Sequence, residues 1–273
     1  MYKKNSKKVY DDYLFGNPSS EYRAAPFWSW NCRLDPKELH EQIDILKKMG
    51  FGGFHMHVRY GLDTPYLSDD FMKLIKDCTE RAKSEKMLAW LYDEDRWPSG
   101  FAGGLVTREK EYRARFLLFT VSPYERDAID RCKETTGFRT DGDAELVARF
   151  DVLLDKDGNL EKYRVIDKND IPDGTVWYAY IDSPKCSDRY NGYTYVNTLD
   201  KKSIDRFIEI TYETYKKWVG EDFDGCVPAI FTDEPQFPLK GTFRYPTSLS
   251  DVTLPWTDDI EETFVKAYGD SLV

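Results

Sequence analysis

Two adjacent carboxylates follow a short apolar segment late in the chain. Ala229–Phe231 is the apolar segment, Asp233 and Glu234 come after it, and Pro235 cannot donate to a sheet ladder, so a strand must end there. An acid at the end of a buried strand is placed to have a raised pKa, as a general acid needs. Taken alone, such an acid pair more often begins a surface turn. Asp233 and Glu234 are candidate catalytic residues if other functional groups lie beside them.

Three earlier segments also end in polar or aromatic side chains. Residues 24–31, 52–58 and 87–92 are predicted strands, and helices are predicted between them. This alternation with short links indicates right-handed βαβ units and a parallel sheet. In a barrel of parallel strands the carboxyl ends carry the chemistry. The candidate substrate-binding residues at these ends are Trp28, Trp30, Asn31, His55, His57, Arg59, Asp93, Glu94, Asp95 and Trp97.

The predicted helices have recognisable ends. Asp35 followed by Pro36 is typical of a helix start, and Ser68 caps a second helix. A long helix is expected over 200–218, an irregular loop over 238–253, and a last helix over 258–268. Each helix follows a strand, as βα units require.

Residues 107–195 interrupt the alternation of strands and helices. Strand-like runs lie at 115–121, 146–154, 163–166 and 175–181, with a hairpin turn at 155–158. We expect a small antiparallel β subdomain inserted after the third parallel strand and packed beside the barrel. The predicted organisation is an N-terminal arm (1–23), a barrel portion (24–106 and 196–273) and this insertion (107–195).

Composition limits the function classes. The chain has 273 residues, a net charge of −10 and no dominant basic segment, so nucleic acid is not an expected partner. Its five cysteines include no C-x-x-C pair, which favours a reducing, cytoplasmic location. We expect no signal peptide and no membrane span. The 15% aromatic content suits sugar binding as well as ordinary packing.

Four motifs together resemble the α-L-rhamnosidase-like glycoside hydrolases, family 106 and its uncharacterised relatives. They are Pro26–Asn31, the Gly-Gly-Phe-His-Met-His run at 52–57, Tyr92–Gly100 and Phe231–Pro235. The resemblance covers roughly residues 24–104 and 190–270. It implies a (β/α)8 TIM barrel that hydrolyses glycosides with two carboxylates and inverts configuration. It also implies a calcium ion near the sugar, for which no ligand in this chain is assignable, and no other cofactor.

Only four strand–helix units are recognisable, so we expect the first four βα units of a (β/α)8-type barrel. Glu234 is expected to protonate the leaving oxygen of an oligosaccharide or glycoside. A second carboxylate lies about 6.5–9.5 Å away in inverting enzymes and about 5–5.5 Å away in retaining ones. Asp93, Glu94 and Asp95 are the other clustered acids.

Two alternatives remain open. The same rim of aromatic and acidic residues suits a non-catalytic carbohydrate-binding or assembly module. A metal-dependent hydrolase would use His55, His57, Asp93 and Asp233. In either glycan reading, Trp30, His57, Asp93 and Glu234 should surround one cleft. Open sheet edges suggest a homodimer, and the isolated chain is expected to have weak activity if the partner carboxylate is missing.

Overall fold

The protein is described by a computed structural model that covers residues 12–123, 144–237 and 240–272. It divides into two compact units. The first comprises Met1–Leu105 and Asp205–Pro235, and the second comprises Val106–Ile204 and Gln236–Val273. The division falls inside helix α5 (Lys201–Ile210). None of the helices in these described ranges is long and apolar enough to cross a membrane.

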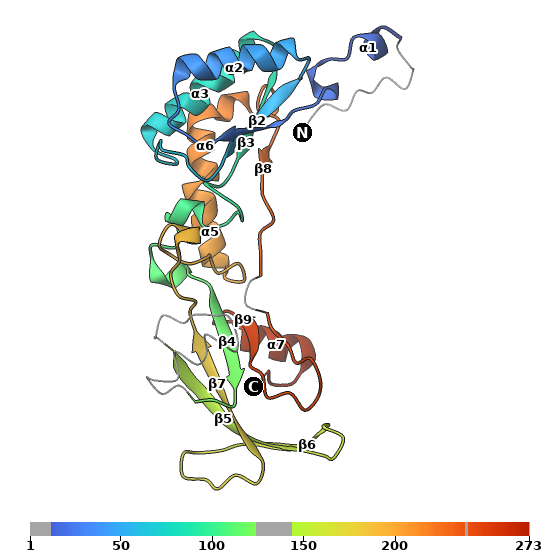
Figure 1. The fold of residues 1–273 in the computed structure, drawn as a ribbon, viewed down its shortest axis with the longest axis vertical. Coiled ribbons are helices and arrows are strands. Elements are labelled where there is room, and N and C mark those ends of the chain that lie inside the picture. The colour runs from blue at the N-terminus through green and yellow to red at the C-terminus, as the bar shows by residue number, and fades with distance from the viewer. Residues whose placement is uncertain (1–11, 124–143, 238–239, 273) are drawn as a thin grey trace. The chain divides into compact units, whose positions relative to one another are not determined.

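The first unit contains a four-stranded parallel sheet. Its strand order is β1-β2-β3-β8, with β1 (Phe27–Trp30), β2 (Gly53–Val58), β3 (Leu88–Tyr92) and β8 (Ile230–Phe231). Helices α2 (Pro36–Lys48), α3 (Asp69–Ser84) and α6 (Tyr212–Val219) lie together beside the sheet (Figure 1). The shorter elements are α1 (Asp12–Gly16), η1 (Ser20–Tyr22), η2 (Ala102–Gly104) and η5 (Gly220–Asp222).

Local sequence explains where α2 and α3 begin. The Asp35 carboxylate accepts the N–H groups of Lys37 and Glu38, and Pro36 occupies the first helical position. The Ser68 hydroxyl accepts the N–H of Phe71 at the start of α3. These caps satisfy N–H groups that have no partner within the helix.

Alternate residues of the parallel strands face two different environments. One set packs with the helices in a continuous apolar core that includes Trp28, Trp30, Phe54, Met56, Leu91, Ile43, Phe71 and Ile75. The other set forms the opposite face of the sheet. There Phe27 lies beside His55, His55 beside Trp90, and Tyr92 beside Phe231 on neighbouring strands. Phe27 is 53% exposed on this second face. The strand period of two therefore places core residues on one face of the sheet and residues such as Phe27 and His55 on the other.

The prediction of a (β/α)8-type TIM barrel is wrong for this structure. Within the described residues the parallel sheet has four strands and is open, and a separate five-stranded sheet is antiparallel. A closed barrel requires every strand to pair on both sides. Here β1 pairs with β2 and β8 pairs with β3, so both are edge strands.

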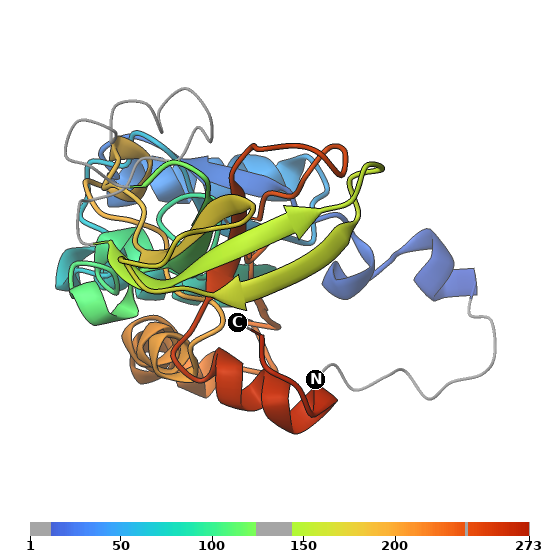
Figure 2. The ribbon, with the colours of Figure 1, turned by 90° about the horizontal axis from the view of Figure 1, so that it is seen from below.

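The second unit is built on the antiparallel sheet, in the order β6-β5-β7-β4-β9. Its strands are β4 (Arg115–Thr120), β5 (Glu145–Leu154), β6 (Leu160–Val165), β7 (Thr175–Asp182) and β9 (Val252–Trp256). Helix α7 (Ile260–Tyr268) and the short η3 (Lys110–Tyr112) and η4 (Asp188–Tyr190) complete it. Figure 2 shows β5 and β6 side by side, which confirms the predicted hairpin.

Two local predictions need correction. The predicted loop over 238–253 runs into β9, which pairs with β4 at the edge of the sheet. Proline is rare within strands because it has no N–H to donate. Pro255 is tolerated in β9 because an edge strand has a neighbour on one side only, so no hydrogen bond of the sheet is lost. The long predicted helix is divided between α5 and α6 at Thr211, whose hydroxyl donates to the Phe207 carbonyl. Back-bonding of this kind bends helices.

Candidate functional site

The end of β3 leads into a tight loop organised by Glu94. This side chain is fully buried and accepts N–H bonds from Asp95, Gly100, Phe101, Ala102 and Gly103, at 2.5–3.0 Å. Burial raises the pKa of Glu94 to about 8, and the N–H donors act against that rise. All of the observed donors are backbone groups. Glu94 therefore holds the loop and does not reach a substrate.

Glycine makes this loop possible. Gly100, Gly103 and Gly104 have positive φ values of 137°, 62° and 94°. A Cβ on Gly103 would lie 2.9 Å from the Cβ of Asp95. The backbone can turn several N–H groups toward one carboxyl group because these positions lack side chains.

Asp93 is the centre of a second buried network. Its Oδ1 accepts the Ser99 hydroxyl at 2.6 Å, and its Oδ2 accepts the Thr232 hydroxyl at 2.7 Å and the Tyr212 hydroxyl at 2.8 Å. Burial raises the pKa of Asp93, and these three donors oppose the rise. The side chain has no exposed surface. Asp93 thus ties β3, α6 and the end of β8 together.

Ser99 connects the loop to the strand end that carries the acid pair. The Asp233 N–H donates to the Ser99 hydroxyl at 2.8 Å, and the Ser99 N–H donates to the Asp233 carbonyl at 2.9 Å. The hydroxyl of Ser99 in turn donates to Asp93. The backbone at Asp233 is therefore fixed from both sides.

Asp95 is also engaged. Its Oδ2 accepts the Arg96 Nε–H at 2.8 Å, and the Arg96 guanidinium lies 4.6 Å from the centre of the Tyr60 ring. Both members of the ion pair are largely shielded from solvent. Of the three acids at 93–95, none presents an exposed carboxylate.

Glu234 differs from all of these acids because it is exposed. Its φ is +45°, in the left-handed region that disfavours side chains longer than Asn. The Trp97 indole N–H donates to its Oε2 at 3.0 Å. An indole can only donate, so this contact engages one carboxylate oxygen, Oε2. Such outliers cluster at functional sites, where surrounding contacts maintain them.

Asp233 is half-buried beside Tyr92 and His57. The Tyr92 hydroxyl donates to its Oδ2 at 3.1 Å, and the same oxygen lies 4.0 Å from His57 Nε2. Burial raises the pKa of Tyr92 far above neutrality, and the Asp233 charge adds to the rise, so Tyr92 stays a donor.

His57 is neutral at pH 7. Burial lowers its pKa to about 4, with smaller contributions from the charges of Arg59 and His55. The 4.0 Å approach to Asp233 is therefore not an ion pair, and it is longer than a hydrogen bond. The buried Nδ1 of His57 has no hydrogen-bond partner in the described part of the chain. Buried polar groups of this kind usually pair with an ordered water when no protein group is in reach.

The structure separates two predicted residues, Trp28 and Trp30, from this group. Trp28 and Trp30 lie in the core on the helix-covered face, where Trp30 contacts the Phe71 ring at 5.8 Å, so they cannot shape a sugar pocket. His55 stacks on Trp90 at 4.9 Å on the same sheet face as His57, and the Phe27 ring contacts both histidines. Asn31 and Arg59 are exposed just after β1 and β2.

Sequence reasoning missed four residues of these networks: Tyr92, Ser99, Tyr212 and Thr232. Tyr92 and Thr232 sit beside the acids that were identified, so the strand ends themselves were the available signal. The glycines at 100, 103 and 104 could have indicated that Glu94 faces backbone N–H groups. Nothing local marks Tyr212, because α6 is brought to β3 by the fold.

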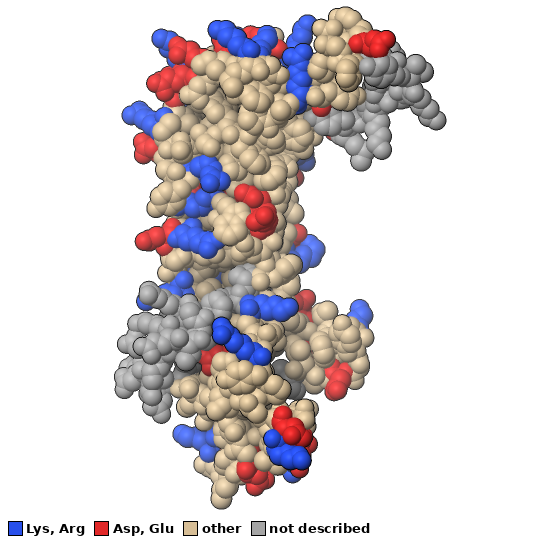
Figure 3. All heavy atoms as spheres, turned by 45° about the vertical axis from the view of Figure 1, so that its right-hand side comes forward, with Lys and Arg blue, Asp and Glu red and all other residues tan. Residues whose placement is uncertain are grey.

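The described residues show no grouping suited to a metal ion. Across 12–123, 144–237 and 240–272, no three His, Cys, Asp or Glu side chains are placed to hold one. Neither the calcium ion implied by the family resemblance nor the alternative metal set of His55, His57, Asp93 and Asp233 gains support from these residues. On the face drawn in Figure 3, positive and negative side chains are interspersed.

Comparison with known proteins gives one structural relationship. No protein-family model matches the chain. No curated protein sequence matches it either. A rhamnosidase from Novosphingobium sp. PP1Y has a similar structure, with a TM-score of 0.54 and 11% sequence identity. The similarity covers 95% of this chain but 41% of that rhamnosidase, so the chain spans about two fifths of its length.

Proposed function

We propose that this chain carries a glycoside hydrolase site of the α-L-rhamnosidase type, with Glu234 as its acid/base residue. The observation that carries the proposal is the state of Glu234. It is the acid at the strand ends that is exposed, held by the Trp97 indole and kept in a left-handed conformation. The structural similarity to a rhamnosidase supports the substrate class.

Asp233 is the second carboxylate in this proposal. Asp93, Glu94 and Asp95 are already bonded to hydroxyl, backbone N–H and guanidinium donors. Asp233 keeps a partly exposed side chain and one hydroxyl donor, Tyr92. It can accept a hydrogen bond from a sugar hydroxyl or from the attacking water.

The chemistry follows from these positions. Glu234 gives its proton to the glycosidic oxygen as the bond from that oxygen to the anomeric carbon breaks. Water adds to the anomeric carbon, and Asp233 takes the proton that the water loses. Trp97 is a positioning residue, because its N–H fixes one oxygen of Glu234 and so directs the other.

The test is hydrolysis of a panel of 4-nitrophenyl glycosides that includes the α-L-rhamnoside. Glu234→Gln should lower the rate at least about 100-fold, the usual contribution of a general acid/base. Glu80→Gln is the matched control, since Glu80 is an exposed acid on α3 remote from the strand ends. Trp97→Phe should lower kcat by about tenfold with little change in KM, because the hydrogen bond that positions Glu234 is lost.

Two results would contradict the proposal. Full activity in Glu234→Gln would remove Glu234 from the chemistry. Absence of hydrolysis by the wild-type chain, together with calorimetric binding of rhamnose or a rhamnose-containing oligosaccharide, would favour the carbohydrate-binding module. That second function is considered because Asp93, Glu94 and Asp95 are buried and already hydrogen-bonded, so they add no free carboxylate to the site.

A further inference from the structure

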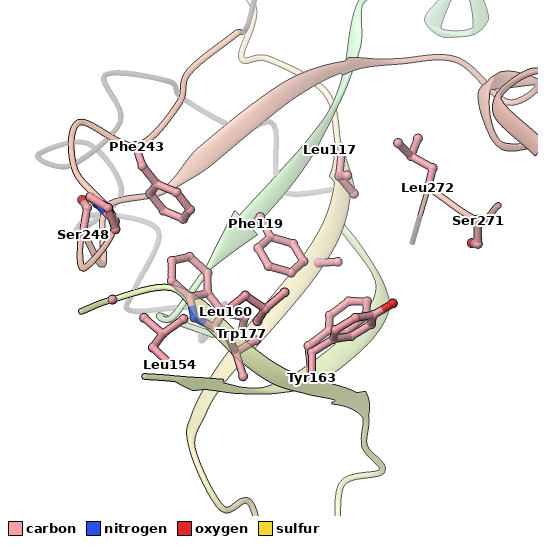
Figure 4. A pocket seen from close by; sticks show the side chains of 15 residues that line it. Leu117, Phe119, Leu154, Leu160, Tyr163, Trp177, Phe243, Ser248, Ser271 and Leu272 are labelled. Atoms are coloured by element: carbon pink, nitrogen blue, oxygen red, sulfur yellow. The ribbon is translucent and has the colours of Figure 1, made fainter. Parts of the chain in front are cut away.

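The second unit contains a pocket of about 480 Å³. It lies on one face of the antiparallel sheet, with walls from β4, β5, β6 and β7, from the 243–248 segment and from residues 271–272 (Figure 4). Binding sites for small molecules usually have volumes of about 300–1,000 Å³.

The chemistry of the walls is uniform. None of the fifteen lining residues carries a charge. Phe119 and Trp177 form a nearly parallel stack, with ring centres 5.5 Å apart and planes 16° apart. Phe243 meets the Trp177 ring edge-on at 5.5 Å. The pocket therefore presents several aromatic faces and edges to whatever enters it.

The pocket is open at an apolar rim. Leu160, Tyr163 and Phe243 are 58%, 60% and 43% exposed. Exposed apolar side chains that surround a concave, apolar site mark a place where a ligand displaces water.

Few polar groups are available to a ligand. The lining hydroxyls belong to Tyr163, Ser248 and Ser271. Ser248 already pairs with the Ser250 hydroxyl at 2.7 Å, and Ser271 donates to Glu261 at 2.6 Å. A sugar would leave many of its own hydroxyls unpaired there, and a charged group would meet no counter-charge.

We propose that this pocket binds a neutral, planar aromatic molecule of two or three rings. Aromatic rings prefer offset or edge-to-face contacts with centres about 4.5–7 Å apart. A planar aromatic ligand can make such contacts with the faces and edges that Phe119, Trp177 and Phe243 present to the pocket. This site lies wholly within the second unit and is independent of the acids at the strand ends of the first.

The experiment is a titration with N-phenyl-1-naphthylamine, a neutral dye whose fluorescence rises in apolar surroundings. Wild-type protein should bind one molecule per chain saturably. Tyr163→Ala removes a ring from the rim and should weaken binding about two- to tenfold, the range for one aromatic contact. Leu160→Glu brings a charge to the rim and should weaken binding at least about tenfold.

Leu146→Glu is the matched control. Leu146 is a 46% exposed leucine on β5 of the same sheet but does not line the pocket, so its variant should keep wild-type affinity. Circular dichroism establishes that each variant is folded. Equal affinity in all four proteins, binding that does not saturate, or displacement of the dye by a neutral oligosaccharide would overturn the proposal.

Discussion

The Asp93 network allows a prediction about stability whose size depends on pH. The change is Tyr212→Phe, which removes one of three hydroxyl donors from a carboxylate with no exposed surface. Hydrogen bonds to charged groups contribute about 1.5–3 kcal/mol, and those between neutral groups about 0.5–1.5 kcal/mol. We expect the variant to lose about 1.5–3 kcal/mol of unfolding free energy near pH 8.

The loss should be smaller near pH 4. Burial raises the folded-state pKa of Asp93 above its unfolded value, so its contribution to stability is present at low pH and is lost as the pH rises. Removing the Tyr212 donor raises the folded-state pKa further. The variant therefore loses more stability than the wild type over the same rise in pH, and the difference between them widens.

Urea unfolding at pH 4, 6 and 8, followed by tryptophan fluorescence, measures the effect. Tyr22→Phe is the control, because Tyr22 is 59% exposed. A difference that stays constant from pH 4 to pH 8 would refute the role given to Asp93. So would a loss below about 0.5 kcal/mol at pH 8, which is less than a neutral hydrogen bond.

Three further predictions concern the same unit. Glu94→Leu should lower the unfolding free energy, measured by thermal melting, by about 5 kcal/mol or more, because five N–H groups lose their acceptor. Glu94→Gln should lower it by less, and equal losses in the two variants would contradict this. Glu234→Val should lower the unfolding free energy by about 1–2 kcal/mol more than Glu234→Asn, since Asn tolerates the left-handed backbone. The reverse order of urea unfolding midpoints would be incompatible with the φ of +45°. His57 is neutral in the folded protein, so the unfolding free energy should fall by up to roughly 3 kcal/mol as the pH drops from 6.5 toward 4. His57→Gln should remove that part of the pH dependence. An unchanged pH profile in this variant would contradict the prediction.

Local sequence was sufficient for most of the elements. Asp35 and Ser68 predicted the starts of α2 and α3, because helix caps depend on residues within one turn. The apolar runs at 52–58 and 87–92 predicted β2 and β3, and Asp155–Gly158 predicted the β5–β6 turn. These features depend on neighbours in the chain, so they could be predicted without the fold.

The environment of each acid depended on the tertiary structure. Asp93, Glu94 and Glu234 lie at strand ends, and the sequence identified all three as candidates. Tyr212 of α6 reaches Asp93, and Trp97 reaches Glu234, from distant parts of the chain. Loop 99–104 reaches Glu94 from only six to nine residues away, but which acid it surrounds is decided by the folded loop. Trp30 was assigned to the site, but strand alternation placed it on the helix-covered face.

Sheet closure also depended on the tertiary structure. Alternating strands and helices predicted parallel pairing, and a barrel was one architecture that such pairing allows. Whether the edge strands find partners is a long-range property, and here β1 and β8 each pair on one side within the described residues. β9 likewise joined the antiparallel sheet despite Pro255, because its position at the edge removed the cost of a missing N–H.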